Sequence, residues 1–202
     1  MELDKFIFYK ENALPLDLCN EIINEYSEAD ELEPSKIVDD EKNNPSGFVY
    51  KNQRDCLLLN MSKDTIVNKS LHRKDLDTKL FNHVGNGLRD YHNFLPTCFS
   101  HFIENTHTQD TGYEFLKYRG MGKFIEHTDY YSQSNRVISL SINLNNNFSG
   151  GEFVFFAGEK YRKVIKQKAG SMTFFPSNFM FPHQIMPVYD GIRYAIVSWF
   201  VW

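Results

Sequence analysis

A histidine and an aspartate stand two positions apart in the segment KFIEHTDYYS, residues 123–132. If this segment is a strand, the side chains of His127 and Asp129 point to the same face, and their backbones lie roughly 6 to 7 Å apart. At that spacing the imidazole and the carboxylate could bind one metal ion, form a hydrogen-bonded pair, or have no chemical role. The pair alone does not decide among these three interpretations.

A second histidine and an arginine follow in FPHQIMPVYDGIR, where His183 lies ten residues before Arg193. With His127 and Asp129, His183 completes a set of two imidazoles and one carboxylate. On one face of an octahedral ion this set leaves three positions open, which is the arrangement of non-haem Fe(II) oxygenases. A bidentate 2-oxo acid could take two of the open positions and dioxygen the third.

Arg193 begins a C-terminal run that is apolar on both alternating faces, so this strand should be covered on both sides. The two faces are Arg193, Ala195, Val197, Trp199 and Val201, and Tyr194, Ile196, Ser198, Phe200 and Trp202. If Arg193 points inward, its buried guanidinium needs an anionic partner. That partner is either an acidic side chain, with Asp190 the nearest in sequence, or the carboxylate of a ligand.

The elements that carry these residues are short strands, because the hydrophobic period is two from Thr111 onward. The β-rich runs are YEFLKY, KFIEHTD, RVISLSINLN, GEFVFF, YRKVIKQ, SMTFF and RYAIVSWFVW. Seven or eight such strands without an intervening helix predict a sandwich or jelly roll. In the run from 136 to 145, Ser139, Ser141 and Asn143 share one face, which either meets solvent or lines a polar pocket.

The N-terminal part is expected to supply supporting helices. A strand-like start over Phe6–Tyr9 precedes apolar residues at helical spacing between Leu14 and Tyr26, with Asp17 as a candidate cap. A second helix is predicted from about Lys74 to Asn93. Its expected core stripe is Leu76, Leu80, Phe81, Val84, Leu88 and Tyr91. Residues 28–55 are predicted to be a loop with one extended piece, either mobile surface or a lid over substrate.

Charge and cysteine content limit the class of protein. The net charge of −4 over 202 residues argues against general nucleic-acid binding, and the basic residues between Lys160 and Lys168 are interpreted as a solvated strand edge. Three separated cysteines form no disulfide framework, which predicts a reducing, cytoplasmic environment. No secretory signal or membrane-spanning run is visible. Nothing in the sequence indicates the oligomeric state.

The C-terminal half resembles the prolyl 4-hydroxylase-like branch of the Fe(II)/2-oxoglutarate-dependent oxygenases. The resemblance runs in order through YRGMGKFIEHTD, RVISLSINLN, FSGGEFVFF, AGSMTFFPS and PHQIMPVYDGIRYAIVSWF. A histidine 54 residues after the HxD aspartate, with a basic residue ten further on, makes it specific. The implied fold is a β-dominated α+β fold, a double-stranded β-helix (jelly roll) core backed by N-terminal helices. One oxygenase domain would then span 1–202, with a variable part over 1–110 and the core over 111–202.

The resemblance also implies roles for individual residues. His127, Asp129 and His183 would ligate Fe(II), Arg193 would pair with the distal carboxylate of 2-oxoglutarate, and Tyr118 would hydrogen-bond near that co-substrate. Asn143 stands where the oxygen-sensing prolyl hydroxylases have a tyrosine that contacts the co-substrate, so the role of Asn143 is open. The implied cofactor is Fe(II), the co-substrates are 2-oxoglutarate and dioxygen, and a requirement for ascorbate is open.

Three functions are compatible with these features. The first is a dioxygenase that hydroxylates an unactivated C–H bond, with a prolyl residue of a peptide or protein as the leading target. The second is the same chemistry on a lysyl side chain, a free amino acid, a nucleobase or another small molecule. The third is a jelly-roll binding module without catalysis, against which the complete set of candidate ligands argues.

Overall fold

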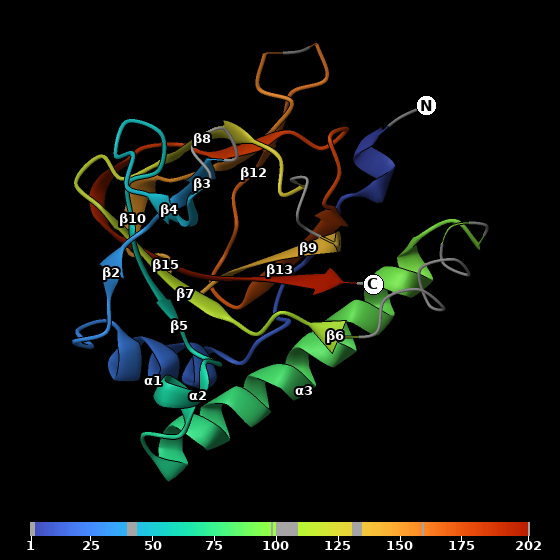
Figure 1. Ribbon diagram of the computed structural model, residues 1–202. Coiled ribbons are helices and arrows are strands. Elements are labelled where there is room, and N and C mark those ends of the chain that lie inside the picture. Colours follow the sequence, from blue (N-terminus) through green and yellow to red (C-terminus); the bar gives the residue numbers. More distant parts are fainter. Residues whose placement is uncertain are drawn as a thin grey trace.

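The computed structural model describes residues 3–39, 44–97, 99, 109–130, 135–158 and 160–201. The helices α1 (Leu16–Tyr26), α2 (Asp64–Val67) and α3 (Leu71–Phe94) precede most of the strands in sequence and lie together along one side of the molecule (Figure 1). The 3₁₀ turn η1 (Leu3–Phe6) lies apart from them, near the N-terminus. Among the described helices, none has both the length and the apolar composition that crossing a membrane requires.

The strands form two facing sheets and a separate two-stranded ribbon. The large sheet has the order β1-β13-β9-β15-β7-β5-β2, and β6 and β10 also pair with β15. Its strands are β1 (Phe8–Lys10), β2 (Glu33–Pro34), β5 (Leu57–Asn60), β6 (Gln109–Asp110), β7 (Glu114–Arg119), β9 (Arg136–Asn143), β10 (Phe148–Gly150), β13 (Ser171–Pro176) and β15 (Val188–Val201). All of the neighbours along this order pair antiparallel.

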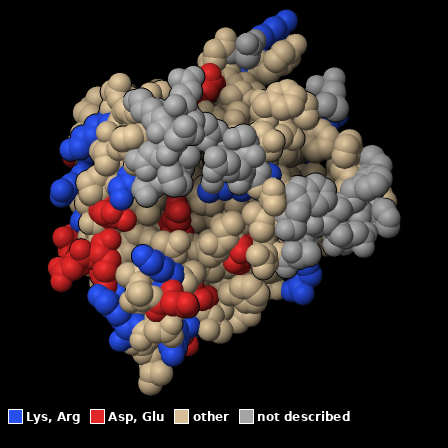
Figure 2. Space-filling model, viewed as in Figure 1, with Lys and Arg blue, Asp and Glu red and all other residues tan. Residues whose placement is uncertain are grey.

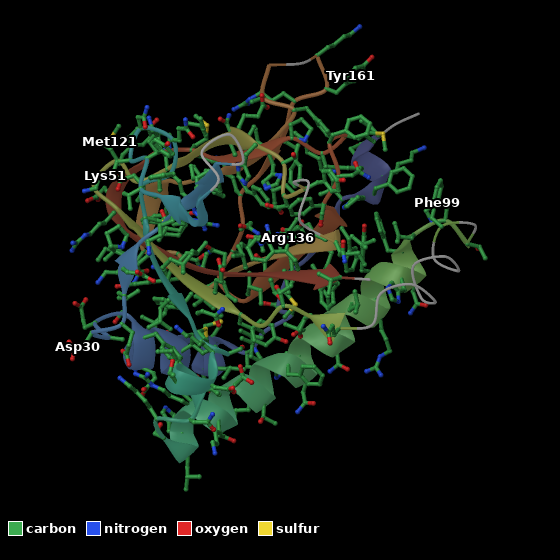
Figure 3. All side chains as sticks on the ribbon, viewed as in Figure 1. Asp30, Lys51, Phe99, Met121, Arg136 and Tyr161 are labelled. Carbon is green, nitrogen blue, oxygen red and sulfur yellow. The ribbon has the colours of Figure 1, made fainter. Side chains whose placement is uncertain are left out.

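The smaller sheet has the order β12-β11-β14-β8. Its strands are β12 (Lys163–Ile165), β11 (Phe153–Phe155), β14 (His183–Ile185) and β8 (Phe124–His127), and the ribbon pairs β3 (Ile37–Asp39) with β4 (Asn44–Phe48). β12 is an edge strand, as the interpretation of the basic segment requires, and Tyr161 lies at the far tip of the hairpin that precedes it (Figure 3). The two sheets give the predicted jelly roll.

The alternation within β9 divides the protein into a helix-facing core and an inter-sheet interior. Ile138, Leu140 and Ile142 pack in the cluster that includes the buried stripe of α3. Ser139, Ser141 and Asn143 point the other way and are also buried. The solvent-facing interpretation of these three residues is therefore wrong, and the alternative of a polar interior is correct.

Across the large sheet, the inward residues of neighbouring strands line up in rows. Asn143 of β9 stands between Ser171 of β13 and Ala195 of β15, and Ser141 stands between Thr173 and Val197. The next row is Phe175, Ser139 and Trp199. The inner face of the sheet is thus polar at one end and aromatic at the other, so the two ends offer different chemical environments.

Several local expectations differ from the structure. α1 begins at Leu16 after Pro15, whose φ fits a helix entry, so Asp17 lies in the first turn and is not the cap. Phe81 of α3 is exposed, because the stripe that contacts the sheet follows Leu76, Leu80, Val84 and Tyr91. The first strand starts at Phe8 rather than Phe6.

The segment 28–55 contains more strand than expected. It carries β2, β3 and β4, while residues 40–43 lie outside the described residues. Acidic and basic side chains lie next to one another near α1 and β2 on the face shown in Figure 2, with no broad area of one charge among the described residues there.

The stripe of α3 yields a stability prediction with a built-in control. Leu80 is fully buried against the large sheet, so Leu80→Ala should lower the free energy of unfolding by about 2 to 5 kcal/mol. Phe81 is 59% exposed, so Phe81→Ala should change it by no more than about 0.5 kcal/mol. Urea denaturation of both variants measures the difference. Equal losses would contradict this orientation of α3.

Candidate active site

Strand pairing brings together three side chains that are distant in sequence. In the antiparallel pair of β8 and β14, His127 stands directly opposite His183, and Asp129 follows β8 by two residues. One carboxylate oxygen of Asp129 lies 3.7 Å from Nε2 of His127 and the other lies 3.7 Å from Nε2 of His183. One ligand atom from each of the three residues lies within 4.8 Å of the others. This spacing suits donors around a single ion.

Both imidazoles are held in the orientation that a metal ligand needs. Nδ1 of His127 donates to the carbonyl of Ile125 at 2.8 Å, and Nδ1 of His183 donates to the carbonyl of Phe181 at 3.0 Å. Since a carbonyl only accepts, each Nδ1 carries the proton and each Nε2 keeps a lone pair. The two lone pairs face Asp129, so the tautomers are already those of metal-binding histidines.

Asp129 is fixed by hydrogen bonds from the large sheet. The hydroxyl of Ser139 donates to Oδ2 of Asp129 at 2.5 Å and also contacts the hydroxyl of Ser177 at 2.8 Å. Arg136 donates to the backbone carbonyl of Asp129 at 3.3 Å and stacks on Trp199, with Cζ 3.6 Å from the ring centroid. The carboxylate therefore has a defined position before any ion binds.

The ionisation states fit a metal site. Burial, together with the neighbouring His183, lowers the pKa of His127 to about 3, so this imidazole is neutral at neutral pH. Burial by itself would raise the pKa of Asp129, but the hydrogen bond from the Ser139 hydroxyl opposes this effect, and the pKa lies below its ordinary value. Two neutral imidazole nitrogens and one ionised carboxylate are a donor set that Fe(II) accepts.

Aromatic side chains exclude water around the two histidines. The Phe124 ring stacks on His127 with centroids 3.5 Å apart, and Phe153, Phe155 and Phe175 surround His183. The side chains of His127 and Asp129 nevertheless keep 19% and 11% of their surface exposed. The candidate site is thus dry on its inner side and accessible from one direction.

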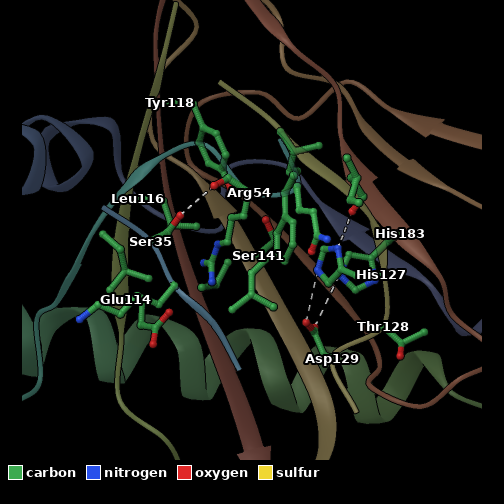
Figure 4. Close-up of a pocket in the computed structure, with 18 of the residues that line it drawn as sticks. Ser35, Arg54, Glu114, Leu116, Tyr118, His127, Thr128, Asp129, Ser141 and His183 are labelled. Carbon is green, nitrogen blue, oxygen red and sulfur yellow. Dashed lines mark hydrogen bonds and ion pairs between the residues drawn. The ribbon is translucent and has the colours of Figure 1, made fainter. Parts of the chain in front are cut away.

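That direction is a cavity of about 430 Å³ between the sheets. His127, Asp129 and His183 lie on one wall, whereas Arg54 and Glu114 lie on the opposite wall with Ser141 between them (Figure 4). Arg136, which also lines the cavity, lies near the middle of the molecule in Figure 3. Residues 33–37 line the cavity as well, so part of the variable segment forms a wall of the site.

Arg54 and Glu114 were not anticipated from the sequence. Arg54 lies in a polar segment with no motif, and Cζ of its guanidinium sits 4.8 Å from the centroid of Phe124. Its Nε is buried and has no hydrogen-bond partner in the described residues. Burial raises the pKa of Glu114, which forms no ion pair within the described part of the chain. Side chains alternate along β7, so Glu114 shares a face with Leu116 and Tyr118. The sequence would have placed Glu114 inward only if that face had been known to point into the interior.

Arg193 does point inward, with only 1% of its surface exposed. Its Nη2 donates to Oε1 of Gln167 at 2.9 Å, and its Cζ lies 5.5 Å from the Tyr118 ring centroid. No acidic side chain in the described ranges forms an ion pair with Arg193, so pairing with Asp190 is not observed, and burial lowers the pKa of the guanidinium. A buried cation without a carboxylate partner is one that an anionic ligand could pair with.

The structure places Tyr118 and Asn143 in the same interior. Tyr118 is opposite Arg193 in the pairing of β7 with β15, and burial raises the pKa of its hydroxyl. The amide of Asn143 donates to the carbonyls of Asn145 and Gln167 at 2.6 and 3.2 Å. The Oδ1 of Asn143 has no partner within the described residues. Asn143 thus anchors the segment that carries Gln167.

Comparison with known proteins agrees with this geometry. Residues 113–201 match the family model described as the 2OG-Fe(II) oxygenase superfamily, which implies Fe(II), 2-oxoglutarate and dioxygen. The resemblance seen in the sequence is therefore confirmed over that region. No curated protein matches the chain in sequence.

Solved structures share the fold at low identity. A prolyl-4-hydroxylase from Pseudomonas putida is 17% identical with a TM-score of 0.69, over 97% of this chain and 92% of that one. A Trichoplax adhaerens prolyl hydroxylase, in complex with a hypoxia inducible factor peptide fragment, is 16% identical with a TM-score of 0.70, over 98% and 84%. A 2OG-Fe(II) oxygenase family oxidoreductase from Burkholderia pseudomallei is 16% identical with a TM-score of 0.64, over 97% and 85%.

The hydrogen bond from Ser139 to Asp129 makes the metal affinity testable. Removing an outer hydrogen bond to a ligand typically costs about 10- to 100-fold in affinity. Ser139→Ala should therefore weaken Fe(II) binding by that factor in an anaerobic titration, and His183→Ala should abolish specific binding. Asp190→Asn, an exposed site on β15, serves as the control and should bind as the unaltered protein does. Unchanged affinity in His183→Ala would show that the ion binds elsewhere.

Proposed function

We propose that this chain, whose residues 113–201 match the 2OG-Fe(II) oxygenase superfamily, is a dioxygenase that hydroxylates an unactivated C–H bond, with a prolyl residue in a peptide as its substrate. The observation that carries the proposal is one interior with two features. At one end it holds His127, Asp129 and His183, whose candidate ligand atoms lie within 4.8 Å of one another, and at the other it holds the buried, carboxylate-free Arg193.

His127, Asp129 and His183 would hold Fe(II), and the imidazole orientations described above leave their Nε2 atoms available for it. When bound, Fe(II) couples the oxidative decarboxylation of 2-oxoglutarate to succinate and carbon dioxide with insertion of the second oxygen atom into the substrate C–H bond. Arg193 would bind the distal carboxylate of 2-oxoglutarate through parallel hydrogen bonds. The Tyr118 hydroxyl would donate a hydrogen bond to the same co-substrate. Asn143, which lies opposite Ala195, would hold the segment that carries Gln167 in place.

The remaining residues of the cavity position the reactants and limit water. The rings of Phe124, Phe153 and Phe175 give the inner side a low dielectric, which strengthens the charge interactions there. Ser139 keeps the Asp129 carboxylate directed between the two histidines. Trp199, stacked under Arg136, offers an apolar plane at the substrate side of the cavity.

Two observations support a prolyl peptide as the substrate. The fold is shared with several prolyl hydroxylases, one of which is in complex with a peptide fragment. Residues 33–37 of the variable segment line the cavity, and an extended peptide could lie along them.

A lysyl side chain is a second candidate, and Glu114 favours it. Glu114 stands in register with Val197 on the inner face of the large sheet and lines the same cavity as the three candidate ligands. A carboxylate there without an ion-pair partner among the described residues could accept the ammonium group of a lysine, which a proline does not offer.

Turnover tests the proposed reaction directly. The protein with Fe(II), 2-oxoglutarate and ¹⁸O₂, with and without ascorbate, should convert 2-oxoglutarate to succinate in the presence of cell lysate. Mass spectrometry should then find one labelled oxygen atom in an acceptor. Asp129→Ala should reduce succinate formation to the background, whereas Asp190→Asn should retain it. Full turnover in Asp129→Ala would refute the mechanism.

Matched peptides separate the two substrate candidates. If proline is the substrate, Glu114→Gln should keep turnover of prolyl peptides within about threefold, and lysyl peptides should remain unmodified. If lysine is the substrate, the same variant should lower turnover of lysyl peptides by roughly 10- to 100-fold, because a charge-assisted hydrogen bond is lost. Glu21→Gln, on the outer surface of α1, is the control. Modification of neither peptide class would exclude both candidates.

A further inference from the structure

The side chain of Gln167 accepts a hydrogen bond from the guanidinium of Arg193. Its Oε1 accepts from Nη2 of Arg193 at 2.9 Å, while its Nε2 donates to the hydroxyl of Thr173 at 2.9 Å. The same Nε2 lies 3.4 Å from the carbonyl oxygen of Ser141. Because a guanidinium only donates, this network fixes the amide with its oxygen toward Arg193.

The position of Gln167 is held from three neighbouring strands. Ser141 belongs to β9, Thr173 to β13 and Arg193 to β15, and the first two form one inward row. The backbone carbonyl of Gln167 also accepts from the amide of Asn143 at 3.2 Å. Gln167 follows the edge strand β12, so these contacts insert a residue from the small sheet into the polar end of the large one.

Gln167 and Arg193 lie at the polar end of the interior, away from the three candidate metal ligands. Ser141, which contacts Gln167, lines the cavity that holds the three candidate ligands. Gln167 and Arg193 themselves line an adjoining cavity of about 330 Å³ together with Gly151. Gly151 has φ of +66°, and a Cβ there would lie 3.0 Å from Cδ of Arg193, so the chain approaches the arginine closely at this point.

A guanidinium has five N–H donors, and Gln167 accepts from one of them. The guanidinium of Arg193 forms no other side-chain hydrogen bond within the described residues. A glutamate at position 167 would occupy the same place with a full negative charge and would neutralise Arg193. The neutral amide instead orients the guanidinium and leaves its charge available.

We propose that Gln167 is a positioning residue for the dicarboxylic co-substrate, selecting 2-oxo acids that carry a distal carboxylate. Its carbonyl holds one N–H of Arg193, so that the remaining donors face the carboxylate of the ligand. Its lack of charge preserves the attraction between that carboxylate and Arg193. The inference rests on the proposed function for the identity of the ligand, and it assigns to Gln167 a role in selectivity that a structural brace would not have.

Two probes that differ only at the distal end provide the test. 2-Oxoglutarate and 2-oxopentanoate have the same chain length and the same 2-oxo acid group, but the second has a methyl group in place of the distal carboxylate. Binding of each to the Mn(II)-loaded protein is measured by anaerobic calorimetry, so the readout does not depend on turnover. The unaltered protein should bind 2-oxoglutarate at least about tenfold more tightly than 2-oxopentanoate, because a charge-assisted pair is available only to the first.

Gln167→Glu should weaken 2-oxoglutarate binding by about 10- to 100-fold and leave 2-oxopentanoate binding within about threefold. Gln167→Asn, which is neutral but too short to reach Arg193 from the same backbone position, should give a smaller loss confined to 2-oxoglutarate. Gln109→Glu makes the same change at an exposed position of β6 and should alter neither affinity. Metal affinity and thermal unfolding of each variant establish that the fold and the ion site are intact.

Unchanged 2-oxoglutarate affinity in Gln167→Glu would overturn the inference. Equal losses for both probes would also overturn it, because they would show that Gln167 acts only as a brace between strands. If the unaltered Mn(II)-loaded protein bound neither probe, the proposed function itself would fail, and the role of Gln167 would fail with it. A loss limited to the dicarboxylic probe is the result that the geometry requires.

Discussion

The candidate site depends on the antiparallel pairing of two short strands, β8 and β14. Their register sets His127 opposite His183, and the pairing becomes irregular immediately after that point. A shift of one residue would turn one histidine to the other face of the sheet, since side chains alternate along a strand. A slip of β14 is opposed by the rings that surround His183, because Phe153, Phe155 and Phe175 would lose their contacts with it.

The candidate site also depends on the large sheet, in which the strand β9 contributes side chains to two environments. β9 contributes Leu140 and its apolar neighbours to the helix-facing core, and it contributes Ser139 and Ser141 to the site. The helices α1 and α3 cover the outer face of this sheet (Figure 1), while hydroxyl groups on its inner face lie within 3 Å of their partners. Packing energy and site geometry are therefore consequences of the same alternation.

Much of this arrangement could be predicted from the sequence, namely the features that a local sequence pattern determines. The period of two in β9 and β15 predicted the faces, and the residue types of His127, Asp129 and His183 predicted a metal site. β14 was not predicted as a strand, because three residues are too few for a periodic signal. Phe81 was assigned to the core because one apolar residue beside a helical stripe cannot be distinguished from the stripe itself. Arg54, Glu114 and Gln167 were missed because only tertiary structure brings them to the site.

The interior holds charged groups that the described residues do not neutralise, and this links ligand binding to stability. Arg193 is buried against a neutral amide, and Nε of Arg54 is buried without an acceptor among the described residues. Each arrangement costs folding free energy, because a charge or donor leaves water without an equivalent partner. An anionic ligand that binds the folded chain and not the unfolded chain raises the free energy of unfolding. The increase grows with the logarithm of the ratio of the ligand concentration to the dissociation constant. An interior that buries such groups is thus less stable than a fully apolar interior would be, and the core between the large sheet and the helices α1 and α3 contributes stability that offsets this cost.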